Sequence, residues 1–397
     1  MDKVLNLDHQ ARGIIKPDGK ITFVKNALPG EIIEYKIIKE TKKYNLGQLT
    51  NIIQKSPHRV ASMCPYFPKC GGCSLHHMAY LDTLDYKKEK VQDILLRYAN
   101  IKPKINVIAN PIYLNYRNKI TLQIKDKKIG YFAENTHDII EITNCLVAKD
   151  SINAIIPDLK KLKINSGSIT IRSNYNDEIM LIINTSQKFE LDFKELSSKH
   201  KLVGVILNNK LIYNEDKFIE NINGKLFQVS YNSFFQVNNY INEKLFEFIA
   251  SNVTKKVIVD MFCGVGTLGI IASFKAKKVY GIENNYHAIL NALVNKKMNE
   301  RSNIDFLLGD ANDLISKIKD NIDTIIIDPP RAGLSQKGIN AILNIKPQEI
   351  IYISCDAMSL TRDLKRLKNI YNITQVHIAD MFSFSYHVES ICVLKKQ

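Results

Sequence analysis

The stretch Val257-Ile-Val-Asp-Met-Phe-Cys-Gly-Val-Gly-Thr-Leu-Gly269 decides the fold of this sequence. An apolar run typical of a buried strand leads into a glycine-rich turn, and a helical pattern follows. Glycines let the backbone of such a turn approach a ligand closely. The next apolar run ends at Glu283, whose carboxylate can accept hydrogen bonds from ribose hydroxyls. This order predicts a nucleotide-ribose site, with a dinucleotide and S-adenosylmethionine both open as ligands.

Strand-like and helix-like segments alternate on both sides of this stretch, through residues 226–397. Such alternation predicts an α/β fold with a parallel, doubly wound sheet, which is a Rossmann-like domain. The predicted strands cover residues 257–260, 278–283, 304–308, 324–328 and 350–354.

Further acids stand where these predicted strands end. One strand ends at Gly309-Asp310, and the next ends in the run Asp328-Pro-Pro-Arg331. Prolines fix φ, so Pro329 and Pro330 predict a rigid lip beside Asp328. Ligands bind at the carboxyl ends of the strands in such sheets. We therefore expect Asp328 to contact a ligand or substrate, the alternative being a plain strand cap.

A cysteine and a glutamate complete the candidate site. Cys355 follows the predicted strand at 350–354, and Glu389 begins an apolar strand near the carboxyl terminus. Alone, Cys355 would be interpreted as a core residue and Glu389 as a surface acid. Together they offer a nucleophile and a base, which the methylation of a pyrimidine carbon requires.

Residues 1–57 alternate short β-rich runs with turn signals and predict a small antiparallel barrel. Eleven basic and six acidic residues occur in the first 60 positions. A basic barrel face can follow a phosphate backbone, as in OB-type folds. The alternative is a solvated β module that does not contact RNA.

Residues 58–225 form the expected central, β-rich domain, with a helix predicted over residues 80–98. Its helical face carries Leu81, Leu84, Val91 and Leu95. Four cysteines of this region could supply thiolates to one metal centre, and we weigh an iron–sulfur cluster against zinc. These cysteines are Cys64, Cys70, Cys73 and Cys145. Cys263 and Cys392 lie in apolar runs and are expected in the core, and His76 and His77 are not expected to be metal ligands.

Composition bounds the class of protein. The chain has 397 residues and a formal net charge of +15, which favours a polyanionic partner such as nucleic acid, although a general lysine bias would give the same sum. The amino terminus lacks the apolar core of a secretion signal, and no stretch is apolar enough to span a membrane. We expect a cytoplasmic monomer.

Motifs over nearly the whole length resemble those of the RNA uracil-C5 methyltransferase family, in the branch with a TRAM domain and an iron–sulfur cluster. The matching segments are residues 23–31, the four cysteines, and residues 233–238, 260–264, 328–333, 354–355 and 387–389. The resemblance implies methylation of a uridine in RNA, with 23S rRNA preferred to tRNA. It implies Cys355 as nucleophile and Glu389 as general base. It also implies a [4Fe-4S] cluster on the four cysteines, and S-adenosylmethionine held by Gln236, Phe262, Glu283, Asp310 and Asp328.

One departure from the family pattern follows the nucleophile, where Asp356-Ala357 replaces the usual Asn-Pro. The extra carboxylate is expected to raise the pKa of the Cys355 thiol. Two alternatives of other classes are a nicotinamide-dependent iron–sulfur oxidoreductase and a non-catalytic RNA-binding factor. The first gives no role to Asp328-Pro-Pro-Arg331 or Cys355, and the second leaves the carboxyl half unexplained.

Overall fold

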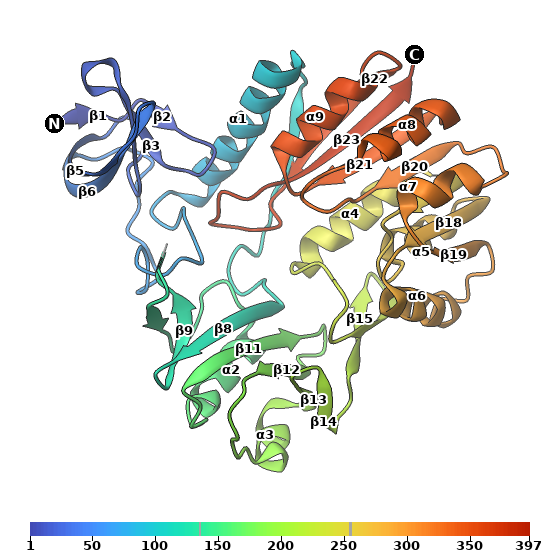
Figure 1. Ribbon diagram of the computed structural model, residues 1–397, viewed down its shortest axis with the longest axis horizontal. Helices are drawn as coiled ribbons and strands as arrows, with labels where there is room; N and C mark the ends of the chain where they lie inside the picture. Colours follow the sequence, from blue (N-terminus) through green and yellow to red (C-terminus); the bar gives the residue numbers. More distant parts are fainter. Residues whose placement is uncertain (135, 254–255) are drawn as a thin grey trace.

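The computed structural model describes residues 1–134, 136–253 and 256–397. Within these residues the strands form a six-stranded, a seven-stranded, a two-stranded and an eight-stranded sheet. Figure 1 shows the amino-terminal sheet in blue, the central sheet in green and the carboxyl-terminal sheet in orange and red, set around the middle of the molecule.

The amino-terminal sheet has the strand order β1-β5-β6-β4-β3-β2. Residues 2–3 pair with β5 and residues 6–7 pair with β3, so the two edges of the sheet are consecutive parts of one segment. Strands β3 to β6 overlap the β-rich runs expected at residues 12–15, 21–24, 32–38 and 47–53, whereas β1 and β2 were not predicted. Strands β4 and β6 are parallel, so the sheet is not wholly antiparallel as expected. The strands are β1 (Asp2–Lys3), β2 (Asn6–Leu7), β3 (Gly13–Ile15), β4 (Ile21–Val24), β5 (Ile32–Glu40) and β6 (Tyr44–Gln54).

The central sheet has the order β10-β9-β8-β11-β12-β13-β14, and β15 and β16 form a separate hairpin. Alternating isoleucines of β11 and β12 pack under α2 in an isoleucine-rich core. The elements are β8 (Lys119–Lys125), β9 (Lys128–Phe132), β10 (Ile139–Glu141), α2 (Asp150–Leu159), β11 (Ser166–Ser173), β12 (Ile179–Asn184), α3 (Phe193–His200), β13 (Leu202–Leu207), β14 (Lys210–Asn214), β15 (Lys217–Ile222) and β16 (Lys225–Ser230).

The carboxyl-terminal sheet has the order β19-β18-β17-β20-β21-β23-β22-β7. Strands β17 to β21 are parallel and lie where the sequence predicts them, and β23 runs antiparallel between β21 and β22. The strands are β7 (Ile105–Ile108), β17 (Val257–Met261), β18 (Lys278–Glu283), β19 (Ile304–Leu308), β20 (Thr324–Ile327), β21 (Glu349–Ser354), β22 (Tyr371–Ala379) and β23 (Glu389–Lys396).

Helices cover both faces of this sheet. Apolar side chains of α1, α8 and α9 form one core with it, and those of α4 and α5 form a second core on the other face. Burial on both faces explains why the parallel strands are continuous apolar runs. The helices are α1 (Tyr80–Ala99), α4 (Asn239–Asn252), α5 (Thr267–Ser273), α6 (Tyr286–Met298), α7 (Ala311–Leu314), α8 (Gln336–Ile345) and α9 (Ala357–Leu367).

Helix α1 and strand β7 depart from the expected division at residue 225, which assigned them to the central domain. Val91, Ile94 and Leu95 of α1 share a core with Leu360 and Leu364 of α9. Strand β7 pairs in parallel with β22 and forms an edge of the carboxyl-terminal sheet. The central sheet is therefore inserted between β7 and β17 of one layered α/β unit.

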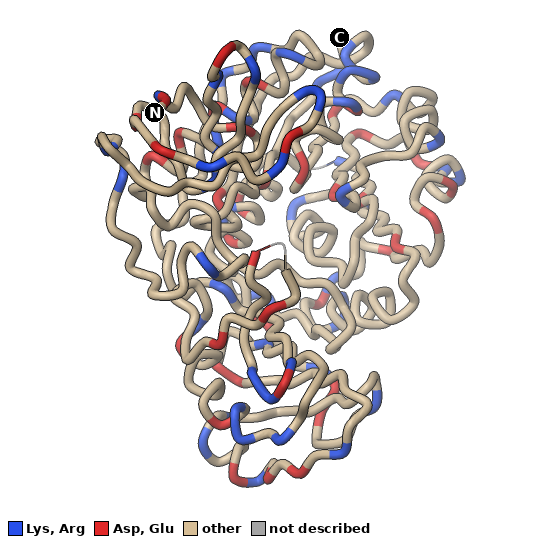
Figure 2. Tube along the Cα trace, turned by 60° about the vertical axis from the view of Figure 1, so that its left-hand side comes forward, with Lys and Arg blue, Asp and Glu red and all other residues tan. Residues whose placement is uncertain are grey.

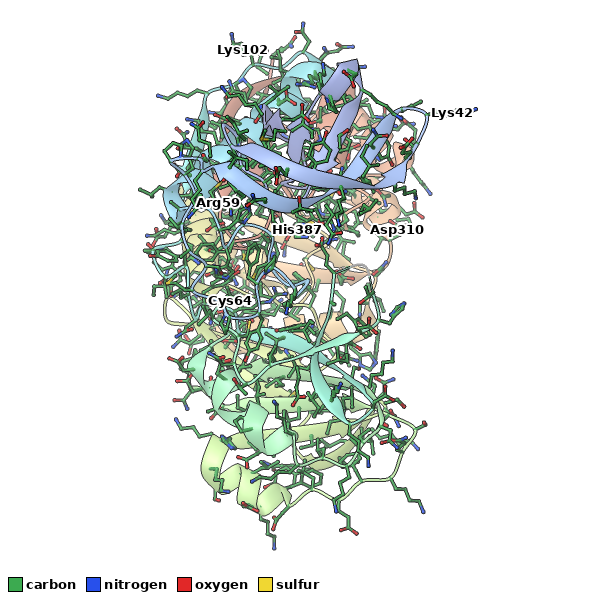
Figure 3. The ribbon with its side chains drawn as sticks, turned by 90° about the vertical axis from the view of Figure 1, so that its left-hand side faces the viewer. Lys42, Arg59, Cys64, Lys102, Asp310 and His387 are labelled. Carbon is green, nitrogen blue, oxygen red and sulfur yellow. The ribbon has the colours of Figure 1, made fainter. Side chains whose placement is uncertain are left out.

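Lysine and arginine positions are spread along the whole Cα trace, with aspartate and glutamate positions between them (Figure 2). Lys42, between β5 and β6, projects away from the body of the protein (Figure 3). Among the helices that the structure describes, none is long and apolar enough to cross a membrane.

Candidate active site

The turn between β17 and α5 presents its backbone at the carboxyl edge of the sheet. Gly264 and Gly266 have φ of 56° and 84°, in the left-handed region that favours glycine. A Cβ on Gly264 would meet no atom of the described residues within 4 Å, so this backbone leaves room for a ligand. The amide of Gly264 donates to Glu283 Oε2 over 3.0 Å, and the amide of Asn285 donates to Glu283 Oε1 over 2.8 Å. Glu283 thus ties the turn to the end of β18.

Three carboxylates converge behind this turn. Asp260 is fully buried, and its Oδ2 accepts a 2.7 Å hydrogen bond from the Gly269 amide. Burial raises the pKa of Asp260 to about 8, and the charges of Asp328 and Glu283 add to the shift. Burial also raises the pKa of Asp328 to about 7. A cationic ligand would stabilise the ionised form of both groups.

The structure brings together most of the residues predicted to hold the cofactor. Gln236, Phe262 and Asp328 line one cavity with Asp260 and Gly264. Glu283 borders this cavity through its bond to Gly264. Asp310 stands apart, because it is exposed and its carboxylate caps α7 by accepting from the Asn312 amide.

The register of two strands places Cys355 beside Glu389. Ser354, the last residue of β21, pairs with Ser390 of antiparallel β23. The next residues outward are Cys355 on one strand and Glu389 on the other. Glu389 is 3% exposed, and its Oε1 has no hydrogen-bond partner in the described structure. Cys355 is partly buried and lines a cavity of about 280 Å³.

The electrostatics of this pair are dominated by burial. Burial raises the pKa of the Cys355 thiol, the charges of Glu389 and Asp328 raise it further, and Arg331 opposes them. Burial and the charge of Asp328 also raise the pKa of Glu389 well above its usual range. Asp356 was expected to raise the thiol pKa, but the described groups that shift it are Glu389, Asp328 and Arg331. The Asp356 carboxylate caps α9 by accepting a 2.7 Å hydrogen bond from the Ser359 amide.

Helix α9 also holds the Asp328-Pro-Pro-Arg331 loop. Asp363, fully buried, accepts hydrogen bonds of 2.8 Å from the Leu334 amide and from the Tyr352 hydroxyl. Arg362 donates to the carbonyls of Ala332 and Leu334. The helix that starts behind Cys355 therefore fixes the loop that carries Asp328 and Arg331.

Cations gather around the loop that precedes Glu389. Burial lowers the pKa of His387 to about 4, and the charges of Arg331, Lys90, Lys87 and Arg117 lower it further. The imidazole is therefore neutral at pH 7. Of these cations Arg331 is exposed and Arg117 is partly exposed, and positive charge of this kind suits a polyanion.

The four predicted cluster cysteines line one cavity of about 520 Å³, which Arg331 and His387 also line. Burial raises the pKa of Cys70 to about 11, and Cys145 and Cys64 add to the shift. Thiols of this kind suit an iron–sulfur cluster as donors. However, the part of the chain that the structure describes holds no group of three or more His, Cys, Asp or Glu side chains arranged to bind a metal ion. The cluster therefore stays a prediction. Figure 3 shows Cys64 and His387 at the middle height of the molecule.

The two remaining cysteines lie in the core as expected, and His76 and His77 stack on aromatic rings. Cys263 and Cys392 are buried in the core. His76 stacks on Phe384 with ring centroids 4.2 Å apart, and His77 stacks on Phe67 at 5.2 Å.

A family model described as tRNA (uracil-5-)-methyltransferase matches residues 79–397. The chain belongs to this family. It is 33% identical to an uncharacterized RNA methyltransferase of Clostridium tetani, over 98% of this chain and 95% of the relative. It is 32% identical to an uncharacterized RNA methyltransferase of Caldanaerobacter subterraneus, over 99% of this chain and 97% of the relative.

A solved structure with the same architecture is the Pyrococcus abyssi tRNA (uracil-54, C5)-methyltransferase in complex with S-adenosyl-L-homocysteine. Its TM-score is 0.83 at 25% identity, and the match covers 99% of this chain and 100% of the other. The family makes this chain an enzyme, an RNA (uracil-5-)-methyltransferase. A nicotinamide-dependent oxidoreductase and a non-catalytic RNA-binding factor are therefore excluded.

The sequence analysis gave no role to two groups near the site. Arg331 belongs to the Asp328-Pro-Pro-Arg331 run, and its closeness to Asp328 in the sequence could have indicated a role. Lys87 lies on the apolar face of α1, between Leu84 and Val91, and is fully buried. A lysine at a core position of a helix is itself unusual, and it could have been noticed.

Proposed function

We propose that this protein transfers the methyl group of S-adenosylmethionine to C5 of a uridine in RNA, through a covalent intermediate on Cys355. The observation that carries the proposal is the register that sets Cys355 beside the buried Glu389, at the sheet edge where Asp328 and the glycine turn also lie. A nucleophile, a base and a nucleotide-binding turn thus share one edge.

The carboxylates of the cavity support S-adenosylmethionine as the cofactor. Asp260 and Asp328 have raised pKa values, and among the described residues neither lies in an ion pair with a basic side chain. S-adenosylmethionine carries a positive sulfonium and an ammonium group, and either would be attracted to these carboxylates. Glu283, at the end of β18, is the proposed partner of the ribose hydroxyls. Gln236 and Phe262 complete the proposed contacts, while Asp310 would lie at the rim.

The chemistry follows from the weak nucleophilicity of uracil C5. The Cys355 thiol loses its proton to solvent, and the thiolate adds to C6, forming a carbon–sulfur bond and, as the C5–C6 double bond opens, an enolate. C5 of the enolate then attacks the methyl carbon, whose bond to the sulfonium breaks and releases S-adenosylhomocysteine. Glu389 removes the C5 proton, the C6–S bond breaks, and the thiolate leaves. A carboxylate with a raised pKa is a stronger base, which suits the proton removal.

The RNA substrate must present its uridine outside a helix, because a stacked base cannot be attacked at C6. The exposed lysines of β5 and the following turn, with Arg331 and Arg117 near His387, would hold the phosphates. We propose a TRAM-like role for residues 1–57 on this basis. The preferred target is 23S rRNA, and the alternative is tRNA, on which the similar Pyrococcus abyssi enzyme acts.

The four cysteines are the proposed ligands of a [4Fe-4S] cluster, which would order the segment that carries Cys64, Cys70 and Cys73. Methyl transfer itself needs no electron, so the cluster has no step in the mechanism. Iron and sulfide analysis of protein purified without oxygen tests this. About four irons per chain would support the proposal, and stoichiometric zinc or no metal would contradict it.

The function is tested by mapping 5-methyluridine by mass spectrometry in rRNA and tRNA from cells with and without the gene. The proposal expects one or more 5-methyluridines to disappear from 23S rRNA and to return when the wild-type protein is supplied. Cys355→Ala should not restore them. Loss confined to tRNA would select the alternative target, and no change in either RNA would contradict the proposal.

A further inference from the structure

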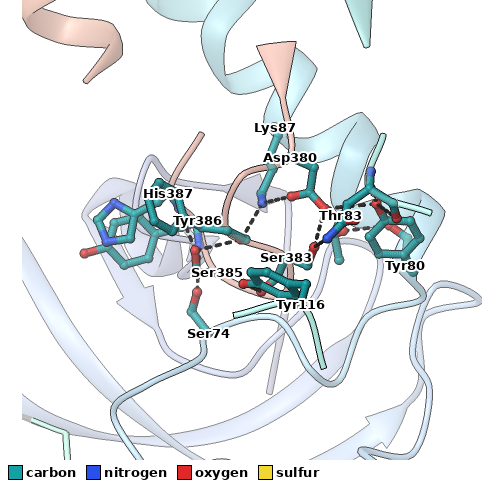
Figure 4. Close-up of polar contacts among 12 residues, drawn as sticks. Ser74, Tyr80, Thr83, Lys87, Tyr116, Asp380, Ser383, Ser385, Tyr386 and His387 are labelled. Carbon is teal, nitrogen blue, oxygen red and sulfur yellow. Dashed lines mark hydrogen bonds and ion pairs between the residues drawn. The ribbon is translucent and has the colours of Figure 1, made fainter. Parts of the chain in front are cut away.

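The loop of residues 380–388 joins β22 to the first residue of β23, which is Glu389. The path of the loop backbone therefore affects the position of Glu389, the proposed base. A dense set of side chains from distant parts of the sequence holds this loop, as Figure 4 shows.

The centre of this set is a fully buried ion pair between α1 and the loop. Lys87 Nζ lies 2.5 Å from Asp380 Oδ1 and donates to the carbonyl of Phe382 over 2.9 Å. The side chains of Lys87 and Asp380 are 0% and 1% exposed. Burying two charges is costly unless each is fully hydrogen-bonded, and such a pair is weak support for stability alone.

The other carboxylate oxygen is also satisfied. Asp380 Oδ2 accepts a 2.9 Å hydrogen bond from the Tyr80 hydroxyl and a 2.6 Å hydrogen bond from the Ser383 hydroxyl. Ser383 in turn accepts a hydrogen bond from the side-chain amide of Asn110. One carboxylate thus joins the first turn of α1, the start of the loop and the segment after β7.

The far end of the loop is held by two further contacts. Lys90, one turn beyond Lys87 on α1, donates to the carbonyl of Tyr386 over 2.7 Å. The amide of Tyr386 donates to Ser74 Oγ over 2.9 Å. Tyr386 is three residues before Glu389, so α1 fixes the loop from its beginning to the approach of the base.

The nucleophile has its own supports outside this loop. Cys355 follows β21, and its neighbour Asp356 caps α9. Glu389 directly follows the 380–388 loop, whereas Cys355 is linked to it only through the pairing of Ser354 with Ser390, so a displacement of the loop would shift Glu389 more than Cys355. The two catalytic steps respond differently to such a displacement.

We propose that Lys87 is a positioning residue, which through Asp380 holds the 380–388 loop so that Glu389 reaches the C5 proton. This inference rests on the proposed roles of Cys355 and Glu389. It predicts a defect in the last step of the reaction, after addition and methyl transfer.

The test compares Lys87→Met with wild type on unmodified 23S rRNA and tRNA transcripts. The rate of methylated-RNA release should fall at least tenfold, and a methylated covalent protein–RNA species should accumulate on a denaturing gel. The dissociation constant for S-adenosylmethionine should stay within about twofold. Tyr80→Phe, which removes one donor to Asp380, should show the same pattern to a smaller extent.

A matched control is Lys256→Met. Lys256 pairs over 3.0 Å with buried Glu349, at the opposite end of β21 from Cys355. This variant should lose stability without accumulating the adduct. Normal turnover by folded Lys87→Met, or slow turnover without adduct, would overturn the inference, and Tyr80→Phe decides in the same way if Lys87→Met does not fold.

The Glu389→Gln variant distinguishes a failure of the proposed base from a failure of the proposed role of Lys87. It should accumulate the same adduct as Lys87→Met. If Glu389→Gln turns over normally, the assignment of the base is wrong and the inference is overturned with it. If Glu389→Gln accumulates adduct and Lys87→Met does not, the inference alone is wrong.

Discussion

At the scale of single residues, the site places acids and a thiol in surroundings that oppose their ionisation. Asp260, Asp328 and Glu389 are held close together with raised pKa values. Ionisable groups with raised pKa values that share a cleft are typical of functional sites. The sequence indicated Asp328, Cys355 and Glu389 because each follows or begins a strand. It could not indicate their pKa values, which depend on burial in three dimensions.

The pKa of Asp328 predicts how cofactor binding depends on pH. A carboxyl group with a pKa of about 7 is largely protonated at pH 6 and largely ionised at pH 7.5. A cationic ligand binds the ionised form, so binding releases a proton and the affinity for S-adenosylmethionine should rise over this range. Calorimetry at several pH values measures it. Asp328→Asn should bind more weakly and show a smaller rise, and an affinity that falls over this range in wild type would count against the assignment.

The charge of Arg331 predicts the reactivity of Cys355. Arg331 is the cation that lowers the thiol pKa against burial and two carboxylates. Removing it in Arg331→Gln should raise that pKa further, so less thiolate is present at a given pH. The alkylation of Cys355 by iodoacetamide, followed on its own peptide by mass spectrometry, should shift to higher pH. Arg301→Gln, whose guanidinium lies over Phe274, should leave the profile unchanged.

Glu283 carries the third prediction at this scale. Its carboxylate binds two backbone amides and is the proposed partner of the ribose. Glu283→Ala should weaken the binding of S-adenosylmethionine by about 1.5–3 kcal/mol, the usual value for hydrogen bonds to a charged group. Calorimetry checks this, and unchanged affinity would remove Glu283 from the binding site.

At the scale of elements, periodicity predicted helices and strands well, but not which elements pack or pair with one another. Residues 80–98 were expected to be helical, and α1 covers Tyr80–Ala99. Leu84, Val91 and Leu95 are buried, but Leu81 is 71% exposed. Periodicity predicts which side of a helix is apolar. How many residues of that side are covered by other elements depends on the tertiary structure. Strand β7 is too short to recognise, and its pairing with β22 joins residues far apart in the sequence.

The cap of α9 gives a prediction about stability. Asp356 accepts a hydrogen bond from the Ser359 amide, so Asp356→Ala should lower the free energy of unfolding by about 0.5–2 kcal/mol. Asp356→Asn keeps a capping oxygen and should cost little. It should also leave the pH profile of Cys355 alkylation unchanged. A shift of that profile to lower pH would show that the Asp356 charge does raise the pKa of the Cys355 thiol, as the sequence analysis expected. Urea denaturation and the alkylation assay measure the two effects.

At the scale of the whole molecule, the three parts of the chain meet at the site. His9 and Gln10, in the turn between β2 and β3, line the cavity of Cys355. Arg117 of the central part lines the neighbouring cavity with Arg331. The sequence could predict the strands of each part from their own patterns. It could not predict these meetings, because they depend on how separate cores pack together.

The basic hairpin of the amino-terminal sheet predicts a salt dependence. Lys36, Lys39, Lys42 and Lys43 are exposed. If they contact phosphates, changing all four to glutamine should weaken RNA binding and flatten its dependence on salt, because fewer counterions are released. The affinity for S-adenosylmethionine should not change. Four exposed lysines of the carboxyl-terminal part provide the matched control, namely Lys297, Lys317, Lys319 and Lys346. Equal losses of RNA affinity in both variants would show that net charge alone matters, and that the amino-terminal hairpin is not a specific RNA-binding surface.

The covalent intermediate is the central claim, and trapping it tests the whole account most directly. RNA containing 5-fluorouridine has no C5 proton for Glu389 to remove, so the reaction should stop after methyl transfer. Wild-type protein incubated with this RNA and S-adenosylmethionine should yield a species whose intact mass equals protein plus methylated RNA, and digestion should place the link at Cys355. Cys355→Ala should give no such species. Full methylation of ordinary RNA by Cys355→Ala, or a link at another residue, would contradict the account.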